Sequence, residues 1–96
     1  MDRNFAENLL NINGSETQYV TYADFEQYNI GHIDSTAFGS FNNLQYLSLE
    51  FNLIITLDPY TFNGLSNLQN LILSNNKLTT LMNYAFNGLS NLQSLG

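Results

Sequence analysis

The chain has 96 residues, enough for one small domain, with eight acidic and two basic residues and a formal net charge of −6. We expect this balance to exclude nucleic acid and anionic membrane surfaces as partners, because only Arg3 and Lys77 are able to neutralise phosphate. Cysteine is absent, which excludes disulfides, thiolate chemistry and the usual zinc ligand sets. No apolar run approaches the roughly 18 residues of a membrane span, and residues 1–5 do not lead into the apolar run of a secretory signal. We therefore expect no direct membrane insertion of this segment.

Residues 1–19 do not share the pattern of the rest of the chain and are interpreted as a cap-like N-terminal segment. Leu9, Leu10 and Ile12 predict a strand that covers the following unit, and Asn13-Gly14-Ser15 predicts a turn. The same triplet matches an N-glycosylation sequon, which leaves the glycosylation of Asn13 open.

From residue 20 onward the chain repeats with a period of 24 residues. Leu44, Leu68 and Leu92 occupy the first position of successive units. The units are residues 20–43, 44–67, 68–91 and a partial fourth, 92–96. A fixed period of this length predicts a solenoid in which each unit packs only on its neighbours. The fourth unit stops before its strand is complete, so we expect a fragment of a longer array with an exposed C-terminal edge that favours self-association.

The start of each unit predicts a short strand, because positions 1, 4 and 6 are apolar and the residues between them are mostly polar. Since the pattern recurs every 24 residues, the strands should stack in parallel at about 4.8 Å spacing. The apolar columns are Val20-Ala23-Phe25, Leu44-Leu47-Leu49 and Leu68-Leu71-Leu73.

The second half of each unit predicts an irregular or 3₁₀-containing return arm with little regular helix, because Gly39, Pro59 and Asn63-Gly64 are turn formers. Apolar residues at positions 11 and 14 and an aromatic column at position 19 should fill the interior of this arm. These residues are Ile30, Ile33, Ile54, Leu57, Leu78 and Leu81, followed by Phe38, Phe62 and Phe86.

Position 9 carries Asn52 and Asn76, and Tyr28 in the first unit. A buried amide is able to satisfy backbone groups that the sheet does not reach. We therefore expect a ladder of Asn side chains that holds the turn after each strand, and a tolerated departure at Tyr28.

The two units L44-x-x-L47-x-L49-x-x-N52-x-I54 and L68-x-x-L71-x-L73-x-x-N76-x-L78 resemble the typical class of leucine-rich repeats. The array is similar to those of Toll-like receptors, Slit-type guidance proteins and small leucine-rich proteoglycans. The resemblance implies an α/β-type leucine-rich-repeat solenoid with a curved parallel sheet on its concave face, and a ligand-recognition role in an extracellular or cell-surface receptor or adhesion protein. The Cys-rich caps of extracellular members are absent.

Partners of the family usually dock on the concave face, where positions 3, 5, 7 and 8 should face solvent. We expect an acidic and aromatic patch that binds a protein ligand, because Tyr is a common interface anchor and carboxylates select a basic segment. An ordinary solvated sheet face is the alternative. The candidate partner-binding residues are Tyr22, Asp24, Glu26, Tyr46, Ser48, Glu50, Phe51, Asn70 and Ile72.

Leu53 and Ile55 stand at positions that the repeat template leaves variable. Two interpretations are open. With Phe51 they form a lateral or self-association surface, or they tuck into the turn beside the strand. The second is the expectation.

No catalytic, cofactor or metal site is expected. Asp24, Glu26 and Glu50 share one face, as a carboxylate-based hydrolase requires, but nothing separates their environments. His32 is the one histidine, and the sequence pattern places no nucleophile or second metal ligand beside it. A self-assembling structural surface repeat stays open as the alternative function.

Overall fold

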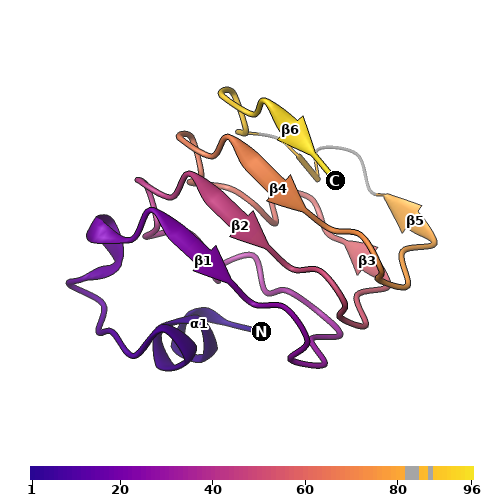
Figure 1. Ribbon diagram of the computed structural model, residues 1–96, viewed down its shortest axis with the longest axis horizontal. Helices are drawn as coiled ribbons and strands as arrows, with labels where there is room; N and C mark the ends of the chain where they lie inside the picture. Colours follow the sequence, from indigo (N-terminus) through magenta and orange to yellow (C-terminus); the bar gives the residue numbers. More distant parts are fainter. Residues whose placement is uncertain (82–84, 87) are drawn as a thin grey trace.

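A computed structural model describes residues 1–81, 85, 86 and 88–96 of the chain. The first half of each unit forms a short parallel strand, and four such strands form one sheet in the order β1-β2-β4-β6 (Figure 1). Their register is the repeat itself, since Tyr22 lies opposite Tyr46, Tyr46 opposite Asn70, and Asn70 opposite Ser94. The predicted parallel sheet is confirmed. The strands are β1 Tyr22–Asp24, β2 Tyr46–Ser48, β4 Asn70–Ile72 and β6 Ser94–Leu95.

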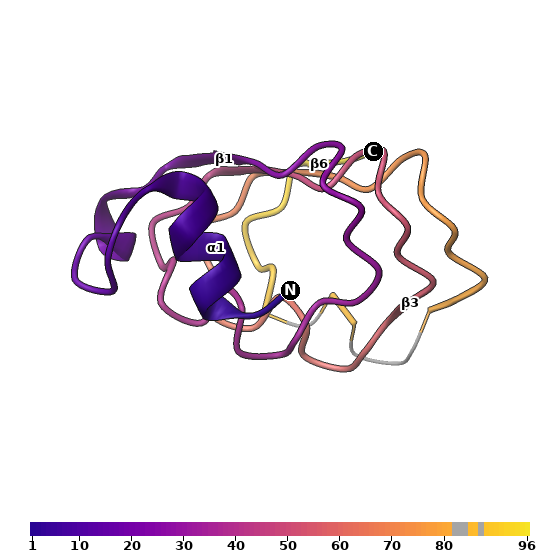
Figure 2. The same cartoon turned by 90° about the horizontal axis from the view of Figure 1, so that it is seen from below.

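The arms return on the opposite side of the core, as Figure 2 shows in cross-section. They consist mainly of turns, together with two two-residue strands, β3 (Thr56–Leu57) and β5 (Thr80–Leu81), which pair in parallel. In the described part of the chain the 3₁₀ helix η1 (Thr17–Tyr19) lies before the first unit and not in an arm. The arms are thus irregular, as predicted. They contain a small second sheet, whereas 3₁₀ turns were one of the predicted alternatives.

The predicted strand at Leu9, Leu10 and Ile12 is wrong, because this region belongs to a helix. Helix α1 spans Arg3–Leu10 and begins at Asp2, whose side chain accepts a hydrogen bond from the Phe5 N–H at 2.9 Å. It ends at Asn11, which adopts a left-handed conformation with φ of 56°. Ala6, Leu9 and Leu10 then fall on one helical face and pack against the core.

Helix α1 lies across the end of the solenoid next to β1 (Figure 2). Two hydrogen bonds attach its start to the first arm: the Met1 ammonium donates to the His32 carbonyl, and the Asp34 N–H donates to the Met1 carbonyl, each at 2.7 Å. Burial of Ala6 and partial burial of its neighbours remove the exposed end of the core from water. The segment therefore lies over the first unit as a helix.

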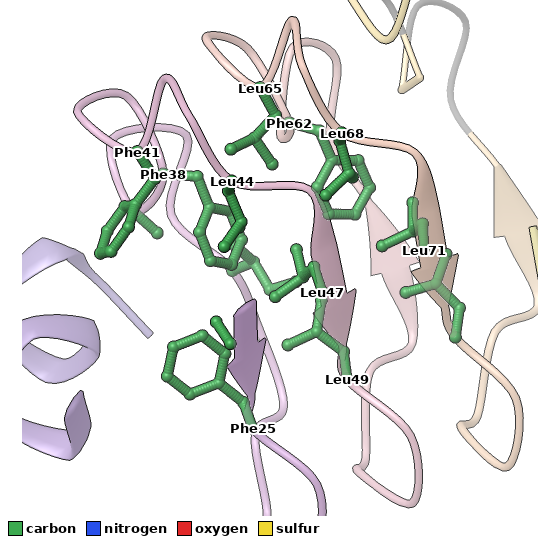
Figure 3. Packing of buried hydrophobic residues seen from close by; sticks show 14 of the residues in the cluster. Phe25, Phe38, Phe41, Leu44, Leu47, Leu49, Phe62, Leu65, Leu68 and Leu71 are labelled. Atoms are coloured by element: carbon green, nitrogen blue, oxygen red, sulfur yellow. The ribbon is translucent and has the colours of Figure 1, made fainter. Parts of the chain in front are cut away.

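The core consists of columns that repeat from unit to unit (Figure 3). The aromatic column is a continuous stack, with ring centroids 6.1 Å apart for Phe38 and Phe62 and 6.0 Å apart for Phe62 and Phe86. Around it the apolar strand columns of the first three units are buried apart from Val20, and so are the arm residues of the first two units. Val20, Leu78 and Leu92 are partly buried, and Leu95 is exposed. The side chain of Leu81 is outside the described part. The repeated apolar positions therefore form one hydrophobic core.

The expected Asn ladder is present and connects the units. The Asn52 amide donates to the carbonyls of Phe25 and Leu49, each at 2.9 Å, and its Oδ1 accepts from the N–H groups of Tyr28 at 3.1 Å and Ile30 at 3.0 Å. One side chain thus satisfies backbone groups of its own unit and of the unit before it.

Asn76 repeats this arrangement one unit later. It donates to the carbonyls of Leu49 and Leu73, each at 2.9 Å, and accepts from the Ile54 N–H at 3.0 Å. Each Asn therefore completes the turn of the preceding unit. The residues before the first unit form α1 and η1 and no repeat turn, so an amide in place of Tyr28 would have no repeat turn to complete. This accounts physically for the departure at position 9 of the first unit.

We expect Asn52→Ala to destabilise the protein strongly. The substitution leaves the Phe25 carbonyl and the N–H groups of Tyr28 and Ile30 without a partner, whereas the Leu49 carbonyl keeps its bond from Asn76. Each buried group without a partner costs about 1–3 kcal/mol, so the total should be about 3 kcal/mol or more. Chemical denaturation measures the change. Asn42→Ala is the control, because Asn42 is exposed and its side chain makes no hydrogen bond to a described residue. A loss below about 1 kcal/mol in Asn52→Ala would contradict the ladder's structural role.

Candidate functional site

The solvent-facing side of β1, β2, β4 and β6, called the strand face below, brings two tyrosines together. The rings of Tyr22 and Tyr46 stack with centroids 4.5 Å apart and planes inclined by 4°. Their register makes them direct neighbours across two strands. Burial raises the pKa of the Tyr46 phenol, and the adjacent Tyr22 and Asp24 raise this pKa further. The two rings form one flat aromatic surface, of which Tyr22 is the more exposed part.

Three predicted carboxylates follow these rings toward the end of the strands. The Asp24 side chain accepts a hydrogen bond from the Glu26 N–H at 2.9 Å, which fixes its orientation. Glu26 and Glu50 occupy equivalent positions one unit apart, and Glu50 Oε2 accepts from the Ser74 hydroxyl at 3.1 Å. Both glutamates are half-buried. The structure thus brings the acidic and the aromatic residues of the first two units onto one surface.

Ser48 does not belong to the exposed surface, and its prediction as a contact residue is wrong. Its exposed fraction is 2%, and its hydroxyl accepts a hydrogen bond from the Glu50 N–H at 3.3 Å. In the sheet it is flanked by the longer side chains of Asp24 and Ile72. A small side chain between two longer ones is covered by them. Ile72 and Asn70 are half-exposed on the same face.

Phe51 is exposed, but it lies in the turn beyond the strand. The three residues at position 8, Gln27, Phe51 and Asn75, all adopt left-handed backbone conformations, with φ of 64°, 57° and 59°. This conformation is uncommon outside glycine and here turns the chain away from the sheet. The Phe51 N–H still donates to the Ser74 carbonyl of the next unit at 3.2 Å. Phe51 therefore borders the acidic patch at the turn.

Leu53 and Ile55 do not tuck into the turn, contrary to the expectation. Their exposed fractions are 44% and 54%, and that of Phe51 is 46%. The template positions beside them, Asn52 and Ile54, are the ones that point inward. Three alternate residues of one segment thus expose apolar side chains on the side of the solenoid where the strands end.

The sequence interpretation missed a groove of about 450 Å³ on the other side, where the chain enters the strands. Two columns line it, at positions 24 and 2 of the repeat: Asn43, Asn67 and Asn91, and Gln45, Gln69 and Gln93. The 24-residue spacing of these amides was visible in the sequence. The repeat template assigns no role to either column, so it predicts no groove there.

The described residues contain neither a cluster of metal-ligating side chains nor a membrane-spanning helix. No three His, Cys, Asp or Glu side chains are grouped there so as to hold a metal ion. His32 Nε2 lies 2.8 Å from Asp58 Oδ2 in an exposed pair between two arms. Within the same part of the chain, no helix has the length and apolar character needed to cross a membrane.

Comparison with known proteins agrees with this geometry. The family model of the leucine rich repeat matches residues 26–78 and 42–96. A crystal structure of a TLR13–ssRNA13 complex contains a chain that superposes with a TM-score of 0.77 and 43% sequence identity. The match covers 78% of the present chain and 11% of the TLR13 chain. No curated protein sequence matches.

The two matched ranges together extend from the first strand's end to residue 96, and they contain the Asn ladder, the Phe stack and three of the four sheet strands. The fold, the family model and the solved structure lead to the same result: this chain belongs to the leucine-rich repeat family.

Proposed function

We propose that this chain is a ligand-recognition module that binds a protein partner through the acidic and aromatic half of its strand face. The stacked pair of Tyr22 and Tyr46, next to Asp24, Glu26 and Glu50, carries this proposal. A rigid aromatic surface loses little conformational entropy on binding, and the carboxylates select a basic segment. Together they fit a partner segment that combines Lys or Arg with apolar side chains.

Family membership supports a recognition role in general, since arrays of this kind present a sheet surface to ligands. The similarity to a TLR13 chain favours a receptor and an extracellular or cell-surface location. Because the match covers 11% of that chain, the role of a whole receptor is part of the proposal. The recognition module is proposed as one segment of such a receptor.

A protein ligand is favoured over RNA by charge. The related TLR13 structure is a complex with single-stranded RNA, so RNA is a necessary comparison. In this chain the candidate patch carries carboxylates and the net charge is −6, which opposes the approach of phosphate. A hydrolase is not favoured, because the carboxylates lie on an open sheet surface and Asp24 is engaged by the Glu26 N–H.

The patch is tested by reversing its charge. We expect peptides selected from a random display library on the native protein to be enriched in Lys and Arg, and Glu26→Lys with Glu50→Lys to weaken their binding by about tenfold or more at low salt. Isothermal titration calorimetry measures the affinities, and circular dichroism checks the fold. A single-stranded RNA oligonucleotide in parallel should not bind the native protein.

The matched control changes the net charge by the same amount elsewhere, with Glu16→Lys and Asp58→Lys. These carboxylates are away from the strand face and make only exposed interactions, each worth under about 1 kcal/mol. Equal weakening by both double variants would show an effect of net charge alone. Unchanged binding after reversal of Glu26 and Glu50 would disprove the patch.

Self-assembly, the alternative function, is supported by a different observation: the apolar residues Phe51, Leu53 and Ile55 are exposed. Adjacent exposed apolar side chains favour contact between copies. If this surface associates, Leu53→Ser with Ile55→Ser should lower the weight-average mass measured by static light scattering at high protein concentration. Phe5→Ser on α1 is the control. A monomeric native protein at that concentration would exclude self-assembly through these residues.

A further inference from the structure

The groove at the entrance to the strands is lined entirely by uncharged side chains, in a chain with a net charge of −6. Its volume of about 450 Å³ lies within the range of ligand pockets. It crosses the segments that enter β1, β2, β4 and β6, so it runs in the direction in which the repeats stack. Tyr19 lines its N-terminal end and has an exposed fraction of 76%.

The asparagines of the groove are held in place by the backbone. The Nδ2 groups of Asn43, Asn67 and Asn91 donate to carbonyls near the end of the preceding repeat or segment, at 2.7, 2.8 and 2.7 Å. The acceptors are Gln18, Asn42 and Ser66. This second Asn column is thus as regular as the ladder in the turns. Each of these Asn amides still has its Oδ1 and one N–H with which to bind other partners.

The glutamines differ, because only their backbone is fixed. The N–H groups of Gln45, Gln69 and Gln93 donate to position-2 carbonyls of the preceding unit, each at 2.8 Å. Their side-chain amides make no hydrogen bond to any described residue, and Gln45 and Gln93 are exposed. Each such amide offers two donors and an acceptor with two lone pairs. The groove therefore carries a row of unused donors and acceptors at the spacing of the strands.

This arrangement selects the ligand by charge and by repeat distance. Without charged groups in the groove, and with an acidic protein around it, phosphate-bearing chains are disfavoured. An extended peptide advances by about 3.3 Å per residue, which does not match the strand spacing of about 4.8 Å. A chain of β-1,4-linked pyranose rings advances by nearly one strand spacing per ring, and successive rings are turned over, so neighbouring repeats face opposite edges of successive rings. Its hydroxyl groups both donate and accept, as amides do.

We propose that this groove binds a neutral, β-linked oligosaccharide, with one sugar ring over each repeat. The Gln45, Gln69 and Gln93 amides bind the hydroxyl groups, the Asn column positions the ring edges, and the Tyr19 ring packs against a pyranose face at the N-terminal end. The groove shares no lining residue with the Tyr22 and Glu50 patch, although Thr21 and Gln45 directly precede Tyr22 and Tyr46, so this proposal does not rest on the proposed protein partner.

The test uses cellotetraose and chitotetraose as probes on the ¹⁵N-labelled protein. We expect the side-chain NH₂ resonances of the three glutamines to shift on titration, and tetramers to bind at least about tenfold more tightly than the corresponding monosaccharides, because only a chain contacts several repeats. Gln45→Ala with Gln69→Ala should weaken tetramer binding by about tenfold or more.

Asn42→Ala with Ser66→Ala is the matched control, since both residues are exposed neighbours of the groove whose side chains do not line it. This control should bind like the native protein. The proposal is overturned if the glutamine resonances do not move at millimolar tetramer, if monomer and tetramer bind equally, or if a uridine octamer or a Gly-Ser peptide binds there more tightly than either tetramer.

Discussion

The fold depends on hydrogen bonds between backbone groups that a three-residue strand leaves unpaired and amide side chains of the neighbouring unit. The strands are too short to satisfy the turn that follows them, and Asn52 and Asn76 supply the missing donors and acceptors. Because these bonds join consecutive units, they impose the same register on every unit. The Phe side chains and the aliphatic side chains then stack in columns, since they recur with the same 24-residue spacing as the Asn residues. Apolar burial supplies most of the stabilising free energy, whereas the amides determine the geometry in which it is gained.

Much of this architecture was predictable from the sequence, because equivalent residues of successive repeats must lie next to each other when the repeats stack. Leu44 and Leu68 must occupy equivalent places if their units stack, so strand direction, register and core follow from the period alone. The start of the chain has no such internal copy. There Leu9, Leu10 and Ile12 suggested a strand, whereas the Asp2 cap and the spacing of Ala6, Leu9 and Leu10 indicate the helix that forms.

The candidate site was predictable only in part, for a physical reason. Which residues face solvent follows from alternation, and Tyr22, Tyr46 and Asp24 lie on the strand face, with Glu26 and Glu50 just beyond the strands. How far a side chain is exposed depends on the size of its neighbours in other units, which alternation does not describe. Ser48 is covered for this reason. Position 8 was expected to continue the sheet, but its left-handed backbone moves Phe51 into the turn. The Asn and Gln columns of the groove were missed because the repeat template describes what holds the units together and not what they present to solvent.

Each Asn of the ladder bonds to the turn of the unit before it, and this direction has a consequence for the synthesis of the chain. The N–H groups of Tyr28 and Ile30 find their acceptor on Asn52, and the N–H of Ile54 finds its acceptor on Asn76, each 22 to 24 residues later. A nascent unit emerging from the ribosome therefore keeps its turn open until the following unit has also emerged. Helix α1, in contrast, contacts the first unit from residues that are already synthesised. Each turn therefore gains its side-chain acceptor only from a unit that is made after it.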